Sequence, residues 1–442
     1  MKIAVVGGGI TGTTVARLLA ESRAVAVTLF DQGQRGFGGR LSHRIVAAEA
    51  ASDAFDHGCQ FFFSSTPRFQ EGAIADWLAA GVVRDWEERR VKWYGTSSLG
   101  YENDFFGILQ NKDQPCYVGV GGMNSIPQYQ ASRAEQSGAT LVRGTRVTST
   151  VKIAGAGGCW ELFGQSGQAA FHNTLEADKR SSAPPSSLGT FDAVIYTDAS
   201  ASYSSWHRAS AGAAEIVPRM AAWIASRPRI PLFAAMLTLP TEYGAFADHD
   251  CLVFESGPLW YACRNGAKLR GAKGSADAAG RDCWTLISTP EFACLEIASV
   301  PMCDVGPDGK PQSFRPQEDS YLNGSGGPAE ALREAFFKAL PTDKPLPPAL
   351  YLQGQRWGSA IPGSFSGADT VEIAGTRYQR NIPPLAPGRL DGSNQEEADF
   401  LADDEQQVYF AGDFVSSSRR PGVEAAVLSA EQCARHVLSK KV

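Results

Sequence analysis

The sequence has 442 residues, of which 43% are hydrophobic and 20% charged, a composition typical of soluble globular proteins with about two to three domains. Its 41 basic and 47 acidic residues give a net charge of −6, so no basic excess indicates nucleic acid or anionic lipid as a partner. No apolar run approaches the roughly 20 residues that a membrane-spanning helix needs.

Nine cysteines are scattered along the chain without a CxxC pair. This pattern predicts neither a zinc site nor a disulfide framework, so we expect no metal and a reducing compartment such as the cytoplasm. The opening residues lead directly into a predicted strand and lack the charged and apolar regions of a secretory signal.

The first fifty residues predict a dinucleotide-binding unit. The β-branched run KIAVV predicts a buried parallel strand, and Gly7, Gly9 and Gly12 then fit the pattern GxGxxG. A helix is expected from the apolar spacing in TTVARLLAE, and AVAVTLF predicts a second strand that ends at Asp31. The alternative is a glycine-rich turn that binds no ligand.

Each part of this unit has a physical role. The first glycine permits the tight turn, the second admits a pyrophosphate close to the backbone, and the third lets helix and strand pack. The helix N-terminus offers free N–H groups to phosphate. Asp31 is expected to accept hydrogen bonds from ribose hydroxyls, which disfavours a 2′-phosphate and hence NADP in this site.

A second glycine-rich turn, GFGGRLSH, follows the second strand. Arg40 in this turn can engage a pyrophosphate with two parallel hydrogen bonds. The alternative is an ordinary loop with a surface arginine.

The next distinctive stretch is DHGCQFFF, residues 56–63. His57 and Cys59 alternate as a ligand pair on a strand would, but two ligands do not make a zinc site. We therefore interpret them as bystanders on one strand face, together with Phe61 and Phe63. The opposite face is expected to carry Asp56, Gly58, Gln60 and Phe62.

The middle of the chain predicts a second sheet. Residues 231–240, 250–256, 259–265 and 283–290 have strand-like composition with turn-rich flanks, and 331–340 reads as a helix. A strand at 191–200 is expected to return to the nucleotide-binding part. Three stretches rich in Gly, Pro and Ser are expected to be surface insertions, namely 164–189, 304–328 and 383–407.

The C-terminal region predicts a strand, QVYFAG, followed by Asp413 and by a helix with an apolar stripe from Val423 onward. Ligands of open α/β sheets bind at the carboxyl ends of the strands, which is where Asp413 would project.

These motifs together resemble FAD-dependent amine oxidase-like flavoproteins, and most closely their renalase-like branch. The matching stretches include VVGGGITGTTVARLL, GGRLS, FDHGCQFFF, YVGVGGMNSIPQ, FDAVIYTD, QRWGSAIP and VYFAGDF. The resemblance implies that Asp413 holds a ribityl hydroxyl, that a backbone group of Val147 meets the adenine, and that the last helix points its N-terminus at the flavin pyrimidine ring. The candidate cofactor-binding residues are Gly7, Gly9, Thr11, Gly12, Asp31, Gln32, Gly39, Arg40, Gln60, Phe61, Val147, Gly412, Asp413, Gly422, Val423, Glu424 and Ala425.

The expected fold is α/β, with a doubly wound Rossmann-type FAD-binding domain and a mainly antiparallel β plus helix substrate domain. The FAD-binding domain is expected to comprise residues 1–65, 118–200 and 350–442. The substrate domain is expected to comprise 66–117 and 201–349.

The expected activity is hydride transfer from a small molecule to flavin N5, with O₂ as electron acceptor. The resemblance implies dihydronicotinamide isomers, oxidised to NAD(P)⁺, as substrates. The alternatives are an oxidase or desaturase for an amine or an apolar isoprenoid- or tetrapyrrole-like substrate, and a flavin-binding module without turnover. Candidate substrate contacts are the aromatic residues Trp260, Tyr261 and Trp357. No catalytic residue and no oligomeric state is assigned. Because no histidine is an obvious general base, a dihydropyridine donor is favoured over an amine.

Overall fold

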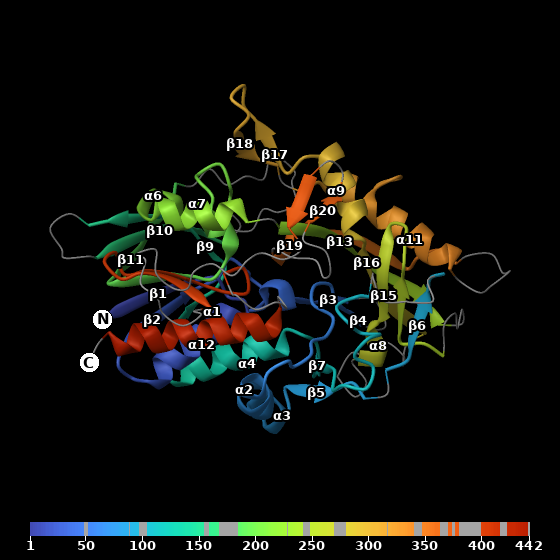
Figure 1. Cartoon of the computed structure of the whole chain (residues 1–442), viewed down its shortest axis with the longest axis horizontal. Coiled ribbons are helices and arrows are strands. Elements are labelled where there is room, and N and C mark those ends of the chain that lie inside the picture. The colour runs from blue at the N-terminus through green and yellow to red at the C-terminus, as the bar shows by residue number, and fades with distance from the viewer. Residues whose placement is uncertain are drawn as a thin grey trace.

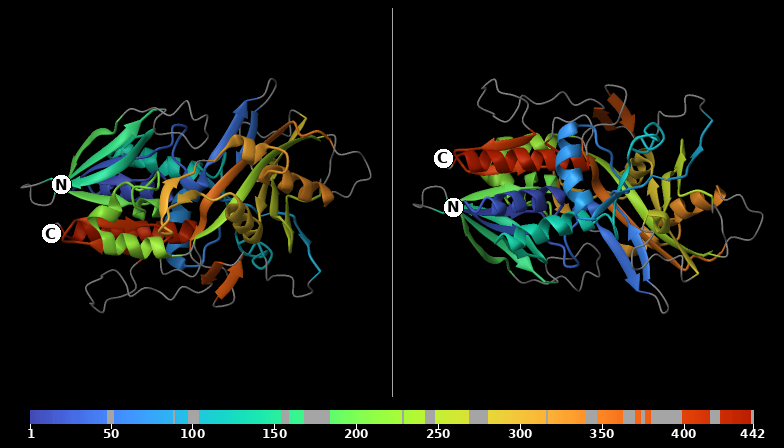
Figure 2. Two further views of the ribbon diagram at one scale, coloured as in Figure 1. Left: turned by 90° about the horizontal axis from the view of Figure 1, so that it is seen from above. Right: turned by 90° about the horizontal axis from the view of Figure 1, so that it is seen from below.

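The computed structural model describes residues 1–440 apart from 48–51, 88, 97–103, 154–158, 168–183, 228, 242–247, 269–279, 316, 340–346, 363–369, 374–375, 380–398 and 416–421. Two six-stranded sheets organise the molecule and lie one after the other along its long axis (Figure 1). Both termini lie at the end that is remote from the second sheet (Figure 2).

The first sheet has the strand order of a doubly wound fold, β22-β23-β12-β1-β2-β8. Its pairings are parallel except that between β22 and β23. The strands are β1 (Lys2–Val6), β2 (Ala26–Phe30), β8 (Thr140–Val142), β12 (Ala193–Tyr196), β22 (Phe400–Asp403) and β23 (Val408–Ala411). The expected Rossmann-type α/β fold is therefore confirmed.

Different layers cover the two faces of this sheet. On one face α1 (Ile10–Glu21) packs between α4 (Ser125–Gln136) and α12 (Val423–Ser439), as the right-hand view of Figure 2 shows. The other face carries a three-stranded sheet of β9 (Thr145–Lys152), β10 (Trp160–Ser166) and β11 (Ser186–Phe191), which encloses its own apolar core. The carboxyl ends of β1 and β23 lead into α1 and α12, so both helices begin at the same edge of the sheet.

The second sheet has the order β19-β13-β16-β15-β14-β6 and is antiparallel except for the pairing of β6 with β14. Its strands are β6 (Val91–Tyr94), β13 (Arg229–Pro240), β14 (Cys251–Phe254), β15 (Leu259–Arg264), β16 (Arg281–Ser288) and β19 (Tyr351–Pro362). β19 falls in the range 350–442 that the sequence assigned to the nucleotide-binding part, yet it pairs with β13.

Helices α9 (Pro290–Ser299) and α11 (Pro328–Lys338) cover one face of the second sheet. The opposite face contributes to a large core that also contains Phe61 and Val423 from the first part. The remaining elements are β3 (His43–Ala47), β4 (Ser52–Asp56), α2 (Pro67–Phe69), a π-helical turn (Gln70–Ile74), α3 (Ala75–Ala79), β5 (Val83–Asp85), β7 (Tyr117–Gly119), α6 (Ala213–Ile216), α7 (Pro218–Ser226), α8 (Asn265–Lys268), β17 (Cys303–Val305), β18 (Pro311–Phe314), α10 (Asp319–Asn323), β20 (Thr370–Ile373), β21 (Thr376–Gln379) and two 3₁₀ turns (Gly39–Leu41 and Ala199–Ser202).

The strands and helices named from the sequence have counterparts in the structure, with ends shifted by a few residues, except the strand expected over residues 56–63. Of the three expected insertions, 304–328 contains the projecting hairpin β17–β18 (Figure 1). Of the other two, 164–189 and 383–407, residues 168–183 and 383–398 lie outside the described residues. Within the described part of the chain, no helix combines the length and apolarity that crossing a membrane requires.

Candidate functional site

The turn between β1 and α1 requires glycine for steric reasons. Gly7 has φ +114°, and a Cβ at this position would lie 2.6 Å from Thr197 Oγ1. A Cβ at Gly12 would lie 1.9 Å from the carbonyl oxygen of Gly7. These two glycines therefore permit the turn and the close packing of helix on strand.

The N-terminus of α1 is buried and has no side-chain cap. Its N-cap residue is Gly9, and both Ile10 and Thr11 are buried in the first turn. The first amides of a helix have no intrahelical acceptor, so a buried helix end without a cap calls for another partner. A Cβ at Gly9 would find only Gly39 Cα within 4 Å, at 3.9 Å, so this glycine is not needed for packing.

The second glycine-rich turn lies beside the first. Gly38 forms a parallel bridge with Gly9, and its amide donates to the Gly8 carbonyl over 3.0 Å. The next residue, Gly39, has φ +55° and also lies beside Gly9. The two turns therefore present adjacent backbone without side chains at the start of α1.

Asp31 is held against the first turn. Its Oδ1 accepts a hydrogen bond from Gly8 N, and its Oδ2 accepts one from Gly33 N, each over 3.1 Å. Burial raises the pKa of Asp31 to about 6, against the lowering effect of these two amides, and Asp198 adds to the rise. Gln32, the next residue, is exposed.

Arg40 and Asp413 form an ion pair with two hydrogen bonds. Arg40 Nη1 donates to Asp413 Oδ2 over 2.8 Å and to the Ala360 carbonyl over 3.2 Å, and Nη2 donates to Asp413 Oδ1. The Asp413 side chain is 1% exposed and that of Arg40 is 37% exposed. The preceding Gly412 has φ +148° and donates its amide to Ser429 Oγ on α12 over 2.8 Å.

The N-terminus of α12 repeats the arrangement at α1. Its N-cap is Gly422, with φ +131° and no side-chain cap, while Val423 and Ala425 are buried. Glu424 turns to a neighbouring loop, where its carboxylate accepts from Ser65 N over 2.8 Å and from Ser65 Oγ over 2.6 Å.

The strand that contains Asp56 ends at that residue, so the alternation expected through Phe63 is wrong. The chain bends at Gly58, where a Cβ would lie 2.1 Å from the Arg40 carbonyl oxygen. The amide of Cys59 donates to that same carbonyl over 2.8 Å. The bend allows neighbouring residues to face one environment, which a straight strand forbids.

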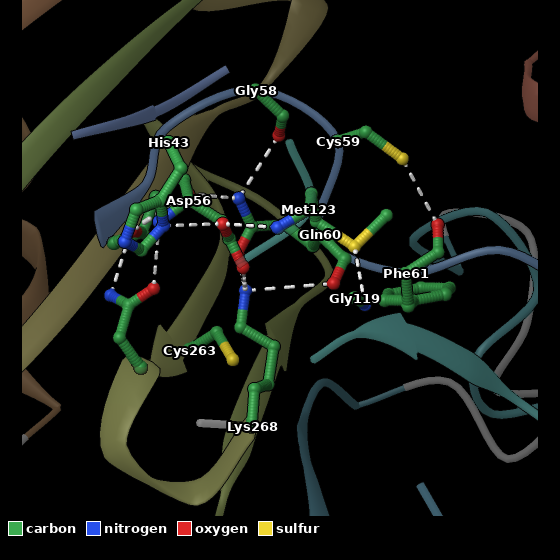
Figure 3. A network of polar contacts seen from close by, with 12 residues as sticks. His43, Asp56, Gly58, Cys59, Gln60, Phe61, Gly119, Met123, Cys263 and Lys268 are labelled. Carbon is green, nitrogen blue, oxygen red and sulfur yellow. Dashed lines mark hydrogen bonds and ion pairs between the residues drawn. The ribbon is translucent and has the colours of Figure 1, made fainter. Parts of the chain in front are cut away.

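The Gln60 side chain is engaged inside the protein (Figure 3). Its Nε2 donates to the carbonyls of Asp56 over 2.5 Å and Gly58 over 3.0 Å, while its Oε1 accepts from Lys268 Nζ over 2.9 Å. Both amide protons are thereby used. The Gln60 side chain therefore has no amide proton left to donate to a ligand.

His43 and Lys268 are site residues that sequence reasoning missed. Asp56 Oδ1 lies 2.8 Å from His43 Nδ1, and Oδ2 lies 3.1 Å from Lys268 Nζ (Figure 3). The Lys268 side chain is fully buried. Its sequence context, RNGAKLRG, is that of an exposed loop, so no local signal identified it.

The side chains of His57 and Cys59 are both engaged within the protein. Burial lowers the pKa of His57 to about 3, and its ring stacks on Trp357 at 5.5 Å between centroids. Burial raises the pKa of the Cys59 thiol to about 12, and its Sγ donates to the Phe61 carbonyl over 3.2 Å. Among the described residues, no group of three or more His, Cys, Asp or Glu side chains could hold a metal.

Two of the three substrate candidates meet in one aromatic cluster. A β-bulge between Leu259 and Tyr261 breaks the alternation of β15. Trp260 and Tyr261 can therefore both contact Phe105, whose ring stacks on Tyr261 at 4.1 Å and meets Trp260 edge-on at 4.9 Å. Phe61 packs against Phe105 and Tyr261.

The remaining candidates lie apart from this cluster. Trp357 donates its indole N–H to the His57 carbonyl over 2.8 Å. Val147 is buried in the core beneath the three-stranded sheet, so only its backbone is open to contact. Phe105 was missed because it lies in a loop, YENDFFGILQ, without strand or helix periodicity.

Comparisons with known proteins agree with this architecture. Residues 5–73 match the family described as NAD(P)-binding Rossmann-like domain. A crystal structure of an oxidoreductase from Methanosarcina mazei aligns over 98% of this chain and 100% of that chain, with 11% identity and a TM-score of 0.52. This likeness shows a shared fold.

Two further structures align less closely. Glycine oxidase from Geobacillus kaustophilus aligns over 99% of this chain and 94% of that chain, with 14% identity and a TM-score of 0.45. Aklavinone-11 hydroxylase, in a complex with FAD and aklavinone, aligns over 99% and 62%, with 12% identity and a TM-score of 0.48. Comparison with curated proteins gives no match.

Proposed function

We propose that this protein is an FAD-dependent oxidoreductase. The observation that carries the proposal is the pair of buried helix N-termini without side-chain caps, α1 and α12, at the carboxyl edge of the first sheet. Such ends suit anionic groups because their free amides and the helix dipoles are favourable to negative charge. FAD has two such groups: its diphosphate would lie at the N-terminus of α1, and its isoalloxazine ring, which takes up negative charge on reduction, at the N-terminus of α12.

The residues at this edge fit such a cofactor. The backbone of Gly9 and Gly39 leaves room beside the first turn of α1 for a diphosphate. Asp31 at the end of β2 is suited to the adenosine ribose, and Asp413 to a polyol hydroxyl. Arg40 donates from Nη1 and Nη2 to Asp413 and thereby fixes the orientation of that carboxylate. We assign the Nε–H of Arg40 to a phosphate oxygen of the cofactor.

When bound, FAD supplies hydride acceptance at flavin N5 and passes electrons to an acceptor, for which we propose O₂. The protein's own contribution is position and solvent exclusion. Phe61 and Phe105 are buried with Tyr261 in an aromatic wall, which suits a flat, largely apolar reacting group. The second sheet is accordingly proposed as the substrate-binding part.

As substrates we propose dihydronicotinamide isomers, on the renalase-like resemblance of the motifs. Such a donor becomes aromatic as hydride leaves and needs no proton acceptor. Near the wall, Lys268 and Asp56 are engaged with each other, and His57 is buried and stacked. This arrangement suits a donor that releases no proton.

The test is anaerobic reduction of the purified protein. Bound cofactor is first identified after acid denaturation, which also reveals whether it is covalently attached. Rapid bleaching of the flavin by dihydronicotinamide isomers and not by amines is the expected result. If amines or an apolar donor bleach the flavin instead, the substrate class is that of the effective donor and not dihydronicotinamide isomers. A bound flavin that no reductant bleaches would indicate a binding module, and a purified protein that neither contains nor takes up FAD would overturn the proposal.

A further inference from the structure

Lys268 is a fully buried cation at the junction of the two sheets. It ends α8, which follows β15 of the second sheet, whereas its partner Asp56 ends β4 and leads into the segment Gly58–Phe61. Nζ lies 3.1 Å from Asp56 Oδ2, and Figure 3 shows it directed at both Asp56 and Gln60. Burying an ionised lysine costs desolvation energy, and such lysines are found only where they are paired. We therefore expect Lys268 to have a specific structural or functional role.

The ammonium group also holds the Gly58–Phe61 segment. Lys268 Nζ donates to Gln60 Oε1 over 2.9 Å and lies 3.5 Å from the Gln60 carbonyl oxygen. Gln60 in turn fixes the bend through its bonds to the Asp56 and Gly58 carbonyls. The lysine thus sets the side-chain rotamer that keeps the bend in place.

The charge states favour holding over proton transfer. Burial alone would raise the pKa of Asp56, but the charge of Lys268 and the hydrogen bond from His43 outweigh it and leave the pKa lowered. Burial alone would lower the pKa of Lys268, but Asp56 outweighs it and leaves the pKa raised. At neutral pH the pair is therefore an ammonium and a carboxylate, and Lys268 has no lone pair with which to accept a proton.

We propose that Lys268 is a positioning residue for the cofactor, acting through Gln60 on the backbone of Gly58–Phe61. This inference rests on the proposed function, because it assumes that this segment lies against bound FAD. Lys268 lies on α8, between β15 and β16 of the second sheet. Its ammonium group would fix the bend at Gly58–Phe61, which belongs to the part of the chain that holds the cofactor.

A second ion pair at the same junction serves as a matched control. Arg281 on β16 binds Asp53 on β4 through Nε–Oδ1 at 2.6 Å and Nη2–Oδ2 at 2.7 Å. Like Lys268 on α8, Arg281 pairs with an aspartate of β4, but its guanidinium binds Asp53, at a distance of three residues from Asp56, and not the Gln60 side chain that holds the bend. Arg281→Met therefore reports the loss of a junction ion pair alone.

The experiment measures FAD dissociation constants, visible flavin spectra and urea unfolding for wild type, Lys268→Met and Arg281→Met. Lys268→Met is expected to weaken FAD binding by about 10-fold or more and to shift the flavin spectrum, because a hydrogen bond from a charged donor is lost. Arg281→Met is expected to lower stability while leaving the FAD affinity within about twofold and the spectrum unchanged.

A second comparison separates positioning from stability. Asp56→Asn leaves Lys268 buried without its counter-ion, so adding Lys268→Met to it is expected to raise stability. The same addition removes the donor to Gln60, so FAD binding is expected to weaken. If stability and FAD affinity change together in the same direction, or if Lys268→Met binds FAD as wild type does, the inference is overturned. Absence of FAD binding in wild type would instead overturn the proposed function.

Discussion

Arg40 and Asp413 are 373 positions apart in the sequence and form a two-bonded ion pair at the carboxyl edge of the first sheet. The Asp413 carboxylate is 1% exposed, so its charge depends on Arg40 for compensation. The pair therefore joins the second glycine-rich turn to the strand that precedes α12.

Replacing Arg40 by Met is expected to destabilise the protein by about 1–3 kcal/mol, because it leaves a buried carboxylate unpaired. Urea unfolding of the cofactor-free protein measures this effect. Arg68→Met is the control: Arg68 pairs with Glu431 at the surface and is 44% exposed, so the cost should stay below about 1 kcal/mol. Equal losses in both variants would contradict the assigned role of Arg40.

Two glycine variants separate folding from cofactor binding. Gly12→Ala places a methyl group 1.9 Å from the Gly7 carbonyl oxygen and should cost about 1–3 kcal/mol. Gly9→Ala meets nothing closer than 3.9 Å and has φ −76°, so the stability of the cofactor-free protein should change by less than about 1 kcal/mol. The added methyl group should nevertheless obstruct a diphosphate. Titration with FAD checks this, and wild-type affinity in Gly9→Ala would place the diphosphate elsewhere.

Asp31 should make FAD affinity depend on pH. Its pKa in the folded protein is raised to about 6, so the carboxylate that accepts ribose hydroxyl bonds is lost as pH falls through about 6. Affinity should then fall by up to about tenfold per pH unit. Asp31→Asn should bind more weakly at pH 8 and lose this dependence, and dissociation constants between pH 5 and 8 test both statements. An unchanged pH profile in the variant would exclude Asp31 as the cause.

Acid should destabilise the protein through two histidines, the buried His57 and the half-buried His207. The pKa of His57 falls from 6.5 to about 3 on folding and that of His207 to about 4, in both cases mainly because of burial. Between pH 6.5 and 4 the unfolded chain therefore binds more protons, and stability declines as pH falls, by up to about 1.4 kcal/mol per pH unit for each histidine.

His57→Phe keeps an aromatic ring on Trp357 and removes one of these protons. Its free energy of unfolding should fall less than that of wild type between pH 6.5 and 4.5, as measured by urea titration at each pH. Parallel pH profiles for the two proteins would show that His57 does not contribute.

The glycine-rich turn between β1 and α1 was predictable because its signals are local. The order of strand, glycines, helix, strand and Asp31 spans about 30 consecutive residues, and each part has its own periodicity or steric rule. The partnership of Arg40 with Asp413 was not predictable in this way. Both were assigned to the cofactor separately, since no spacing rule relates residues brought together by tertiary packing.

Departures from regular structure account for most of what was missed. The bend at Gly58 ended an alternation that the sequence alone suggests, and the bulge in β15 brought Trp260 and Tyr261 to one cluster. Phe105 and Lys268 lie in segments whose composition is that of loops. Their burial depends on where the second sheet lies, which no local pattern encodes.

The distance in sequence between Arg40 and Asp413 also has a consequence for biosynthesis. A ribosome adds about 5–20 residues per second, so Arg40 waits roughly 20–75 s for its counter-ion to be made. Glu424, which binds Ser65, is made later still. The edge of the first sheet therefore closes only when translation is nearly complete. Until then the nascent chain exposes an unfinished first sheet, whose transiently exposed apolar surface favours aggregation.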